Sequence, residues 1–363
     1  MKRVVIVTWT GVYNYGTCLQ SYALQNVLER LGYHVMILDK LCFEHPLKTI
    51  LNKCVKRLHT LKKRNYAKIA RMDKFHKEEQ YIIRPRNMKQ LKSLIKKTDV
   101  FISGSDQIWN TAYKYTPMMF LDFADNKKRI SYATSIGTAD IPEEYKEIIK
   151  GHLQKYQHIS VRETTAANVL KTITGRKDII QVLDPTFLLT SDSWHMFGEK
   201  AEFRTELPDE YVFCYFVGDN NYYSQQVNDI IKRINLNHIV IATLKSTSSF
   251  SIEGAIVLND AGPMEFVHLI EHSSLVCTDS FHATAIAINL RKPFIELLRF
   301  SDEDNASQNT RIYDLLAHYD LKERIYSNKH TQWMQPIDYN RVYEILHKDR
   351  IYSLNYLSSS IEN

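Results

Sequence analysis

The sequence has little glycine and proline, few cysteines and no long apolar run. Its 363 residues include 11 glycines and 9 prolines, a composition that excludes a fibrous or low-complexity chain. The cysteines are scattered and form no CxxC pair, so they indicate neither a zinc site nor a disulfide framework, and they fit a reducing compartment. They are Cys18, Cys42, Cys54, Cys214 and Cys277.

Signals for membrane insertion and secretion are missing as well. No stretch approaches the roughly 18–20 apolar residues of a membrane span. The N-terminal "MKRVVIVTWT" has a basic start, but its apolar run is too short for a signal peptide and indicates a first strand. We therefore expect a cytoplasmic protein.

Acidic residues are scarce in one segment, although the whole chain carries a formal charge of only +6. Residues 48–97 hold 17 lysines and arginines against three acidic residues, and their apolar residues recur at helical spacing at Ile50, Cys54, Leu58 and Leu61. This cationic helix fits contact with an anionic membrane surface, a diphosphate or an acidic glycan, and it equally fits an ordinary solvated face. Aromatic residues are sparse there and no nucleic-acid motif appears, so we expect no nucleic-acid partner.

What the sequence does contain is an alternation of strand and helix patterns. A β-branched run at 3–9, a helical pattern ending at Gly32 and a second run at 35–39 predict a βαβ unit, and hence a parallel sheet. Strand patterns resume at 99–104, 129–135, 158–163 and 179–185.

A second alternation begins at residue 210. Its strand patterns lie at 210–218, 237–244, 254–260, 273–280 and 292–298. The sequence therefore predicts an α/β fold of two doubly wound, Rossmann-like domains with a cleft between them. We place the first domain at 1–190 with a basic helical insert at about 42–98, the second at 191–335, and a last helix at 336–363 that packs back.

Ligands of open α/β sheets bind beyond the carboxyl ends of the strands, so the candidate residues were sought there. The first such loop, "GVYNYGT", offers Asn14 and Gly16, which fit either backbone binding of an anion or a tight turn. The loop "SGSDQIWN" offers Ser105, Asp106 and Gln107 for sugar hydroxyls or for orienting a cation; a helix cap with Trp109 packed beneath it is the alternative.

Two further strand ends in the first half carry charge. In "SVRE", Arg162 fits bidentate binding of a carboxylate or phosphate, or an ordinary ion pair with Glu163. In "VLDPTFLL", the Asp184-Pro185 pair indicates a turn that closes the first domain.

The second half offers one well-placed histidine. His282 follows a strand pattern and begins a helix rich in small residues, where the helix dipole disfavours the imidazolium form and favours proton exchange near neutral pH. Further on, Asn309 and Arg311 precede a helix and fit either contacts in the cleft or a helix cap.

Several of these segments, in this order, resemble the polysaccharide pyruvyl transferase family. They are "NYGTCLQSYALQNVLERLGY", "ISGSDQIWN", "SYATSIG", "ISVRE", "VLDPTFLL", "TDSFHATAIAINLRKPFI" and "TRIYDLLAHYDL". The resemblance covers nearly the whole chain outside the basic segment. It implies two Rossmann-like domains similar to the GT-B glycosyltransferases, with the active site in the cleft.

The resemblance also implies a reaction. Phosphoenolpyruvate would be the donor, with no further cofactor and no essential metal, and the product would be a pyruvate ketal across two hydroxyls of a sugar. The acceptor would belong to a bacterial capsule or exopolysaccharide, or to its lipid-linked precursor. By position in the family, Arg162 would hold an anionic group of the donor, His282 would act as acid/base or phosphate contact, and Asp106 and Gln107 would line the acceptor side or support the loop.

The chain departs from the family pattern at one place. Family members often have Arg-x-His where this chain has Ser280-Phe281-His282. Either another cation, such as Lys245, Arg299 or Arg311, replaces the arginine at Ser280, or this branch of the family uses a different donor. Two alternatives remain open: a GT-B glycosyltransferase that uses a nucleotide sugar, and a non-catalytic glycan-binding protein. The former needs a nucleotide-binding acidic residue in the second half, where we find no convincing one.

Overall fold

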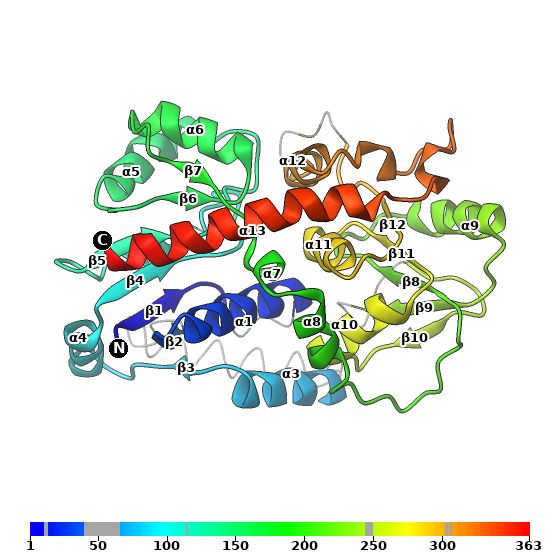
Figure 1. Ribbon diagram of the computed structural model, residues 1–363, viewed down its shortest axis with the longest axis horizontal. Helices are drawn as coiled ribbons and strands as arrows, with labels where there is room; N and C mark the ends of the chain where they lie inside the picture. Colours follow the sequence, from blue (N-terminus) through cyan, green and yellow to red (C-terminus); the bar gives the residue numbers. More distant parts are fainter. Residues whose placement is uncertain (11–13, 40–65, 114, 244–249, 302–303, 305–306) are drawn as a thin grey trace.

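The computed structural model describes residues 1–10, 14–39, 66–113, 115–243, 250–301, 304 and 307–363. Two α/β lobes lie side by side, and the last helix runs across both (Figure 1). The four apolar residues at helical spacing in the basic segment, Ile50, Cys54, Leu58 and Leu61, lie outside the described residues, as does Lys245.

The first lobe is built on a parallel sheet with the strand order β3-β2-β1-β4-β5. Its central strand is buried on both faces, which explains why it is a continuous β-branched run rather than an alternating one. The strands are β1 (Arg3–Val7), β2 (His34–Leu38), β3 (Ile82–Ile83), β4 (Val100–Ser103) and β5 (Lys128–Ser131). A short parallel pair, β6 (Ser160–Val161) and β7 (Ile180–Gln181), continues beside β5 through a bridge between Ile130 and His158.

Helices connect these strands and cover the sheet. They are α1 (Tyr15–Arg30), α3 (Tyr66–Glu78), α4 (Met88–Lys97), α5 (Glu143–Leu153) and α6 (Thr164–Thr174), with a 3-10 turn, η1, at Pro117–Phe120. The interpretation of 42–98 as a helical insert is wrong for its last part. β3 pairs with β2, and α4 leads from β3 into β4, so residues 82–97 belong to the sheet itself. The two-residue strand is too short to show a period in the sequence.

The second lobe repeats the architecture with the strand order β10-β9-β8-β11-β12, again all parallel. The prediction of two Rossmann-like sheets is confirmed. The strands are β8 (Val212–Tyr215), β9 (Ile239–Ala242), β10 (Ile256–Leu258), β11 (Leu275–Thr278) and β12 (Phe294–Glu296). The helices are α9 (Tyr223–Ile234), α10 (Pro263–His272), α11 (Phe281–Asn289) and α12 (Thr310–His318), with 3-10 turns η2 (Lys322–Arg324) and η3 (Gln332–Met334).

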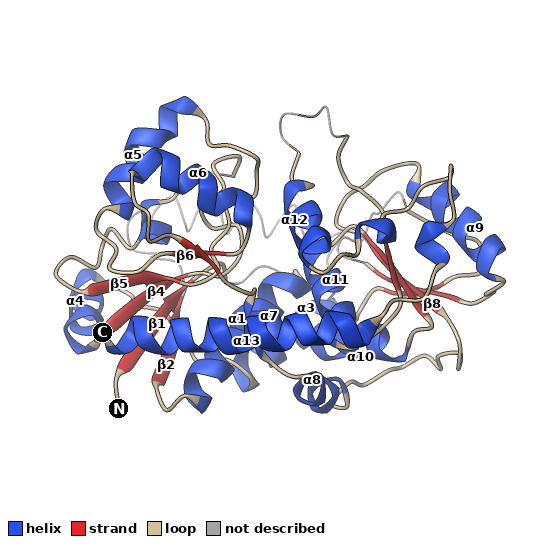
Figure 2. Cartoon of the chain, turned by 45° about the horizontal axis from the view of Figure 1, so that its top comes forward, coloured by secondary structure: helices blue, strands red, loops and turns tan. Residues whose placement is uncertain are grey.

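Two short helices carry the chain between the lobes, and a long one returns. They are α7 (Pro185–Leu188), α8 (Ser191–Gly198) and α13 (Tyr339–Glu362). Figure 2 shows α13 spanning both lobes. Its Tyr343 hydroxyl donates to the carbonyl of Asn289 in the second lobe, and Lys2 pairs with Glu362 at 2.8 Å in the first. No helix among the residues described above is long and apolar enough to cross a membrane.

The lobes share one apolar core rather than meeting only at a linker. Tyr15, at the start of α1, stacks on Phe266 of α10 with ring centroids 4.5 Å apart. Its hydroxyl donates to the carbonyl of Ala261 at 3.0 Å. The beginning of α1 is therefore fixed against the second lobe, and this contact positions the site described next.

Candidate active site

The loops after β1 and β4 meet at the point where the first sheet reverses its winding direction, which is where α/β sheets bind ligands. Asp106 lies in this region with a positive φ of 75°, a conformation that aspartate tolerates better than most residues. Thr17 of α1 donates its hydroxyl to the Asp106 carboxylate at 3.0 Å. The loop after β4 is thereby tied to the first turn of α1.

Arg162 follows β6 and is the centre of a buried ionic cluster. Its guanidinium lies within ion-pair distance of three carboxylates, those of Glu163 at 2.8 Å, Asp184 at 3.1 Å and Asp106 at 3.8 Å. Burial alone would lower the pKa of Arg162, but the three carboxylates more than offset it, so the pKa is raised. The guanidinium also stacks on the ring of Phe281, with its carbon 4.0 Å from the ring centroid. Its Nη2 has no hydrogen-bond partner among the described residues.

Asp184 joins this cluster to the second lobe. It caps α7 by accepting the Thr186 backbone N–H at 3.0 Å, and its other oxygen accepts the Ser105 hydroxyl at 3.1 Å. The same oxygen lies 3.6 Å from Nε2 of His282. Burial would raise the pKa of Asp184, but the charges of His282 and Arg162 hold it below its ordinary value. Asp184 is therefore a fixed carboxylate facing an imidazole.

His282 lies in the first turn of α11, where Ser280 caps the helix by accepting the Ala283 backbone N–H. Its ring packs directly over Gly16 of α1: a Cβ at that glycine would lie 2.3 Å from Nδ1. Only glycine allows the two helix starts to approach this closely. Nε2 is buried and, in the described part of the chain, makes no hydrogen bond.

Arg311 is a second buried guanidinium, in the first turn of α12. It contacts Gln308 through two donors at 3.3 Å each, and within the described ranges no carboxylate lies at ion-pair distance from it. Burial and the nearby charges of Arg162 and Arg299 lower its pKa to about 10. Because an unpaired buried charge is costly, this arrangement favours an anionic ligand.

Two pockets adjoin these groups. A narrow one is lined by Arg162, Asp184, Phe281 and Arg311, among others. A wider, open one lies between the loops at 111–112 and 138–145 and the start of α12.

The structure gathers most of the predicted site residues but assigns them different tasks. His282, Arg162, Gly16, Ser105, Asp106 and Arg311 meet around the cluster, whereas Asn14 caps α1 and Ser280 caps α11. Gln107 accepts a hydrogen bond from Asn110 beneath Gly137. Trp109 stacks on Phe120 and is a packing residue. The alternative interpretation of 105–106 as a helix cap is wrong, because no helix begins there.

The sequence analysis did not identify three residues that take part in the cluster. Asp184 was expected only to form a turn, yet it links Arg162, Ser105 and His282. Thr17 and Phe281 were not singled out. A carboxylate at the end of a strand, as in "VLDP", was the available signal for Asp184.

Two parallel sheets whose strand ends meet across a polar cluster define a GT-B type of fold, and solved structures agree. The wall teichoic acid polymerase TagF, H444N variant, has a TM-score of 0.55 at 10% identity, over 99% of this chain and 89% of that chain. S. aureus MnaA with UDP has a TM-score of 0.53 at 12% identity, over 98% of this chain and 90% of that chain. UDP-GlcNAc 2-epimerase from Methanocaldococcus jannaschii has a TM-score of 0.50 at 14% identity, over 96% of this chain and 100% of that chain. At these identities the likeness shows the fold alone.

Residues 14–299 match the family model of polysaccharide pyruvyl transferase, and the chain belongs to that family. It is therefore a transferase. A search of curated proteins finds no match.

Proposed function

We propose that this protein transfers the enolpyruvyl group of phosphoenolpyruvate to two hydroxyls of one sugar and releases phosphate, leaving a pyruvate ketal. The sugar belongs to a surface polysaccharide or its lipid-linked precursor. The proposal rests on family membership and on one observation above all: Arg311 is buried, has no carboxylate partner in the described chain, and shares a pocket with Arg162. A small dianion would supply the missing counter-charge.

In this proposal Arg311 binds the carboxylate or phosphate of the donor and takes the place of the family arginine that is Ser280 here. Of the other candidates, Lys245 lies outside the described residues, and Arg299 is already paired with Asp279 at 2.9 Å. Arg162, which was expected to hold the donor, is largely neutralised by its three carboxylates. Its main task is then to position Asp184 and Asp106, with Nη2 left for the ligand.

His282 serves as the general acid. Its Nε2 delivers a proton to the methylene carbon of phosphoenolpyruvate while a sugar oxygen bonds to the neighbouring carbon, and Asp184 stabilises the imidazolium form at 3.6 Å. Phosphate then leaves with its bonding electrons and the second hydroxyl closes the ring. One hydroxyl proton returns to His282 and the other passes to the leaving phosphate. The open pocket beside α12 has room for the acceptor glycan.

The nucleotide-sugar alternative is less well supported by the second lobe. The backbone N–H groups of Val217 and Gly218, after the central strand β8, both donate to Asp279 at 2.7 Å. These donors lie where a parallel sheet would hold a phosphate, and an internal carboxylate occupies them.

Calorimetric titration tests the proposal. We expect phosphoenolpyruvate to bind the full chain, and Arg311→Ala to weaken that binding at least tenfold, because a charge-assisted contact is worth about 1.5–3 kcal/mol. Arg341→Ala, which removes an exposed arginine, is the control and should bind as the native protein does. A preference for UDP- or CDP-sugars would favour the glycosyltransferase, and silence from all donors a glycan-binding protein.

Contact with an anionic membrane is a further part of the proposal. It rests on the 17 basic residues between 48 and 97. Those between 48 and 65 lie outside the described residues. Sedimentation of the full chain with phosphatidylglycerol vesicles, against neutral vesicles, measures it.

A further inference from the structure

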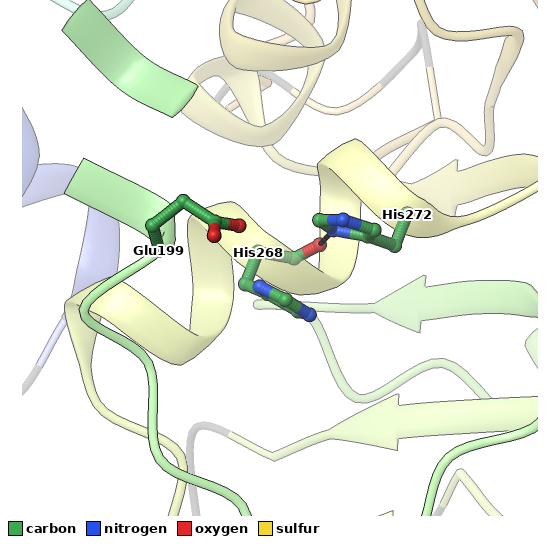
Figure 3. A group of neighbouring side chains, drawn as sticks. All are labelled: Glu199, His268 and His272. Atoms are coloured by element: carbon green, nitrogen blue, oxygen red, sulfur yellow. Dashed lines mark hydrogen bonds between the residues drawn. The ribbon is translucent and has the colours of Figure 1, made fainter. Parts of the chain in front are cut away.

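A cluster of metal-ligating side chains lies on α8 and α10. His268 and His272 are four residues apart on α10, so both project from one face of the helix. Glu199 directly follows α8 and caps its end. Figure 3 shows its carboxylate directed toward the two imidazoles. One ligand atom from each of the three residues lies within 4.8 Å of the others.

The hydrogen bonds leave the imidazole nitrogens suited to coordination. Nδ1 of His272 is 3.0 Å from the carbonyl oxygen of His268 (Figure 3). Because a carbonyl only accepts, Nδ1 carries the proton, and Nε2 of the neutral ring keeps its lone pair. Histidines that bind metals are commonly oriented by such a bond from the other ring nitrogen.

His268 is also available as a ligand. Its Nδ1 is buried and, in the part of the chain that is described, has no hydrogen-bond partner. The two rings stack with centroids 3.9 Å apart.

We propose that Glu199, His268 and His272 bind a divalent transition-metal ion, and that zinc fits this set best. Two imidazole nitrogens and one carboxylate oxygen are an established zinc ligand set, with a fourth position left to water. Bond lengths near 2.0–2.2 Å need the donors slightly closer than they lie here, and the partly exposed side chains can rotate to reach them. Glu271, which pairs with His195 at 2.8 Å, adds a second carboxylate to the surroundings of His268.

The ion would join the end of α8 to α10. α8 lies in the segment that leads from the first lobe to the second, and it packs closely on α10. The site uses no residue of the ionic cluster around Arg162, so the metal would brace the fold and take no part in the transfer.

Titration of zinc chloride into the metal-free full chain tests the site. We expect one ion to bind per chain, and both Glu199→Gln and His272→Ala, which change exposed side chains, to weaken binding at least tenfold. His318→Ala is the matched control, because this histidine also pairs with a carboxylate, Asp349, between two helices. It should leave the affinity unchanged.

Two further measurements make the outcome decisive. Cobalt(II) in place of zinc should give visible absorption bands that His272→Ala abolishes, and zinc should raise the melting temperature of the native chain more than that of His272→Ala. Failure of stoichiometric binding, or equal binding by the native chain and His272→Ala, would overturn the assignment. Phosphoenolpyruvate binding should stay unchanged in His272→Ala, so this result is independent of the proposed transfer.

Discussion

Two of the buried arginines, Arg162 and Arg311, differ in what surrounds them, and the proposed function gives them different tasks. Arg162 is held by three carboxylates, whereas the hydrogen bonds of Arg311 within the described part of the chain go to the side-chain amide and the carbonyl of Gln308. Burying a guanidinium without a counter-ion costs free energy that the fold must supply elsewhere. We interpret Arg311 as a residue selected for its ligand and Arg162 as one selected for its neighbours.

The close contact between Gly16 and His282 leads to a prediction for Gly16→Ala. In Gly16→Ala the new methyl would meet the ring of His282 at 2.3 Å, so the imidazole must shift. We expect the free energy of unfolding to fall by about 1–3 kcal/mol, the usual cost of overpacking, and phosphate release from phosphoenolpyruvate to fall at least tenfold.

The double variant Gly16→Ala/His282→Ala shows whether the loss of stability in Gly16→Ala comes from the clash with His282 or from the change of residue within α1. Removing the ring relieves the two closest contacts, at 2.3 and 2.6 Å, but leaves the Cβ of residue 282 at 2.8 Å. Gly16→Ala should therefore cost less free energy of unfolding in the His282→Ala background than in the native protein. Urea unfolding of the four proteins measures the cycle. Additive losses would mean that the two residues do not touch.

Asp184 makes a second prediction, with a defined pH dependence. Asp184→Asn should lower the free energy of unfolding by about 2–3 kcal/mol at pH 7, because charge-assisted bonds from Arg162 and Ser105 weaken. The folded-state pKa of Asp184 lies below its unfolded value near 3.9, so its contribution is complete above that pH and is lost as the pH falls through the folded value.

The difference between the native protein and Asp184→Asn should therefore shrink as the pH falls below about 4 and Asp184 takes up a proton. Denaturant unfolding across this range measures it. Asp320→Asn, at an exposed carboxylate paired with Arg341, serves as the comparison and should cost less than about 1 kcal/mol throughout. A difference that grows as the pH falls below about 4 would contradict this account.

At the scale of whole elements, α13 carries the clearest structural role. One side of it is buried along its length, with Val342, Leu346, Leu357 and Ile361 in the apolar core. Its polar contacts reach backbone groups of the segment that leads from the first lobe to the second: Arg350 donates to the carbonyl of Phe187 at 2.8 Å, and Ser353 accepts the N–H of Leu183 at 3.0 Å. The helix therefore holds the crossing segment between the lobes.

Leu346→Ala tests this role. Leu346 is fully buried, and truncating such a leucine should cost about 2–5 kcal/mol of the free energy of unfolding. Ile351→Ala, on the same helix but 49% exposed, should cost less than about 1 kcal/mol. Thermal and urea unfolding measure both variants, and equal losses would mean that α13 does not pack as described.

The elements themselves were predictable for a physical reason. Strands buried on both faces must be short, continuous apolar runs, and the sequence shows such runs at β1, β2, β4, β8 and β11. β3 was missed because two residues show no period, and the strand was hidden in a basic segment. In general the strands are shorter than their apolar patterns, since the runs continue into buried loops such as 132–136.

The site was predictable only in part. Strand ends pointed to Arg162, Asp106 and His282, because topology alone brings strand ends to one edge of a sheet. Pairing could not be predicted: Arg162 and Asp184 are 22 residues apart, and Asp184 and His282 belong to different lobes. An Asp-Pro pair resembles a turn until the other partners are in place.

The whole molecule brings two lobes together through contacts that flank the cluster. α3 reaches from the first lobe to the second: Arg71 pairs with Glu265 at 3.1 Å, and Lys68 donates to the carbonyl of Thr243 at 2.5 Å. On another side, Asp314 of α12 accepts the N–H of Thr165 at 3.0 Å and its hydroxyl at 3.2 Å. Since α6 begins two residues after Arg162 and α12 carries Arg311, this contact sets the distance between the two guanidinium groups.

Asp314→Ala should therefore impair ligand binding, although Asp314 lines the narrow pocket itself and its negative charge would repel an anionic donor. Two hydrogen bonds at the start of α6 are lost, and we expect the dissociation constant of phosphoenolpyruvate to rise about tenfold, equivalent to about 1.4 kcal/mol. Asp314→Asn keeps an oxygen for the Thr165 N–H, so its affinity should stay within about threefold of the native value. Calorimetry on the native protein and both variants decides: an equal loss in the two would mean that the charge of Asp314, rather than its position between the lobes, matters, and no loss in either would show that the spacing of Arg162 and Arg311 is set elsewhere.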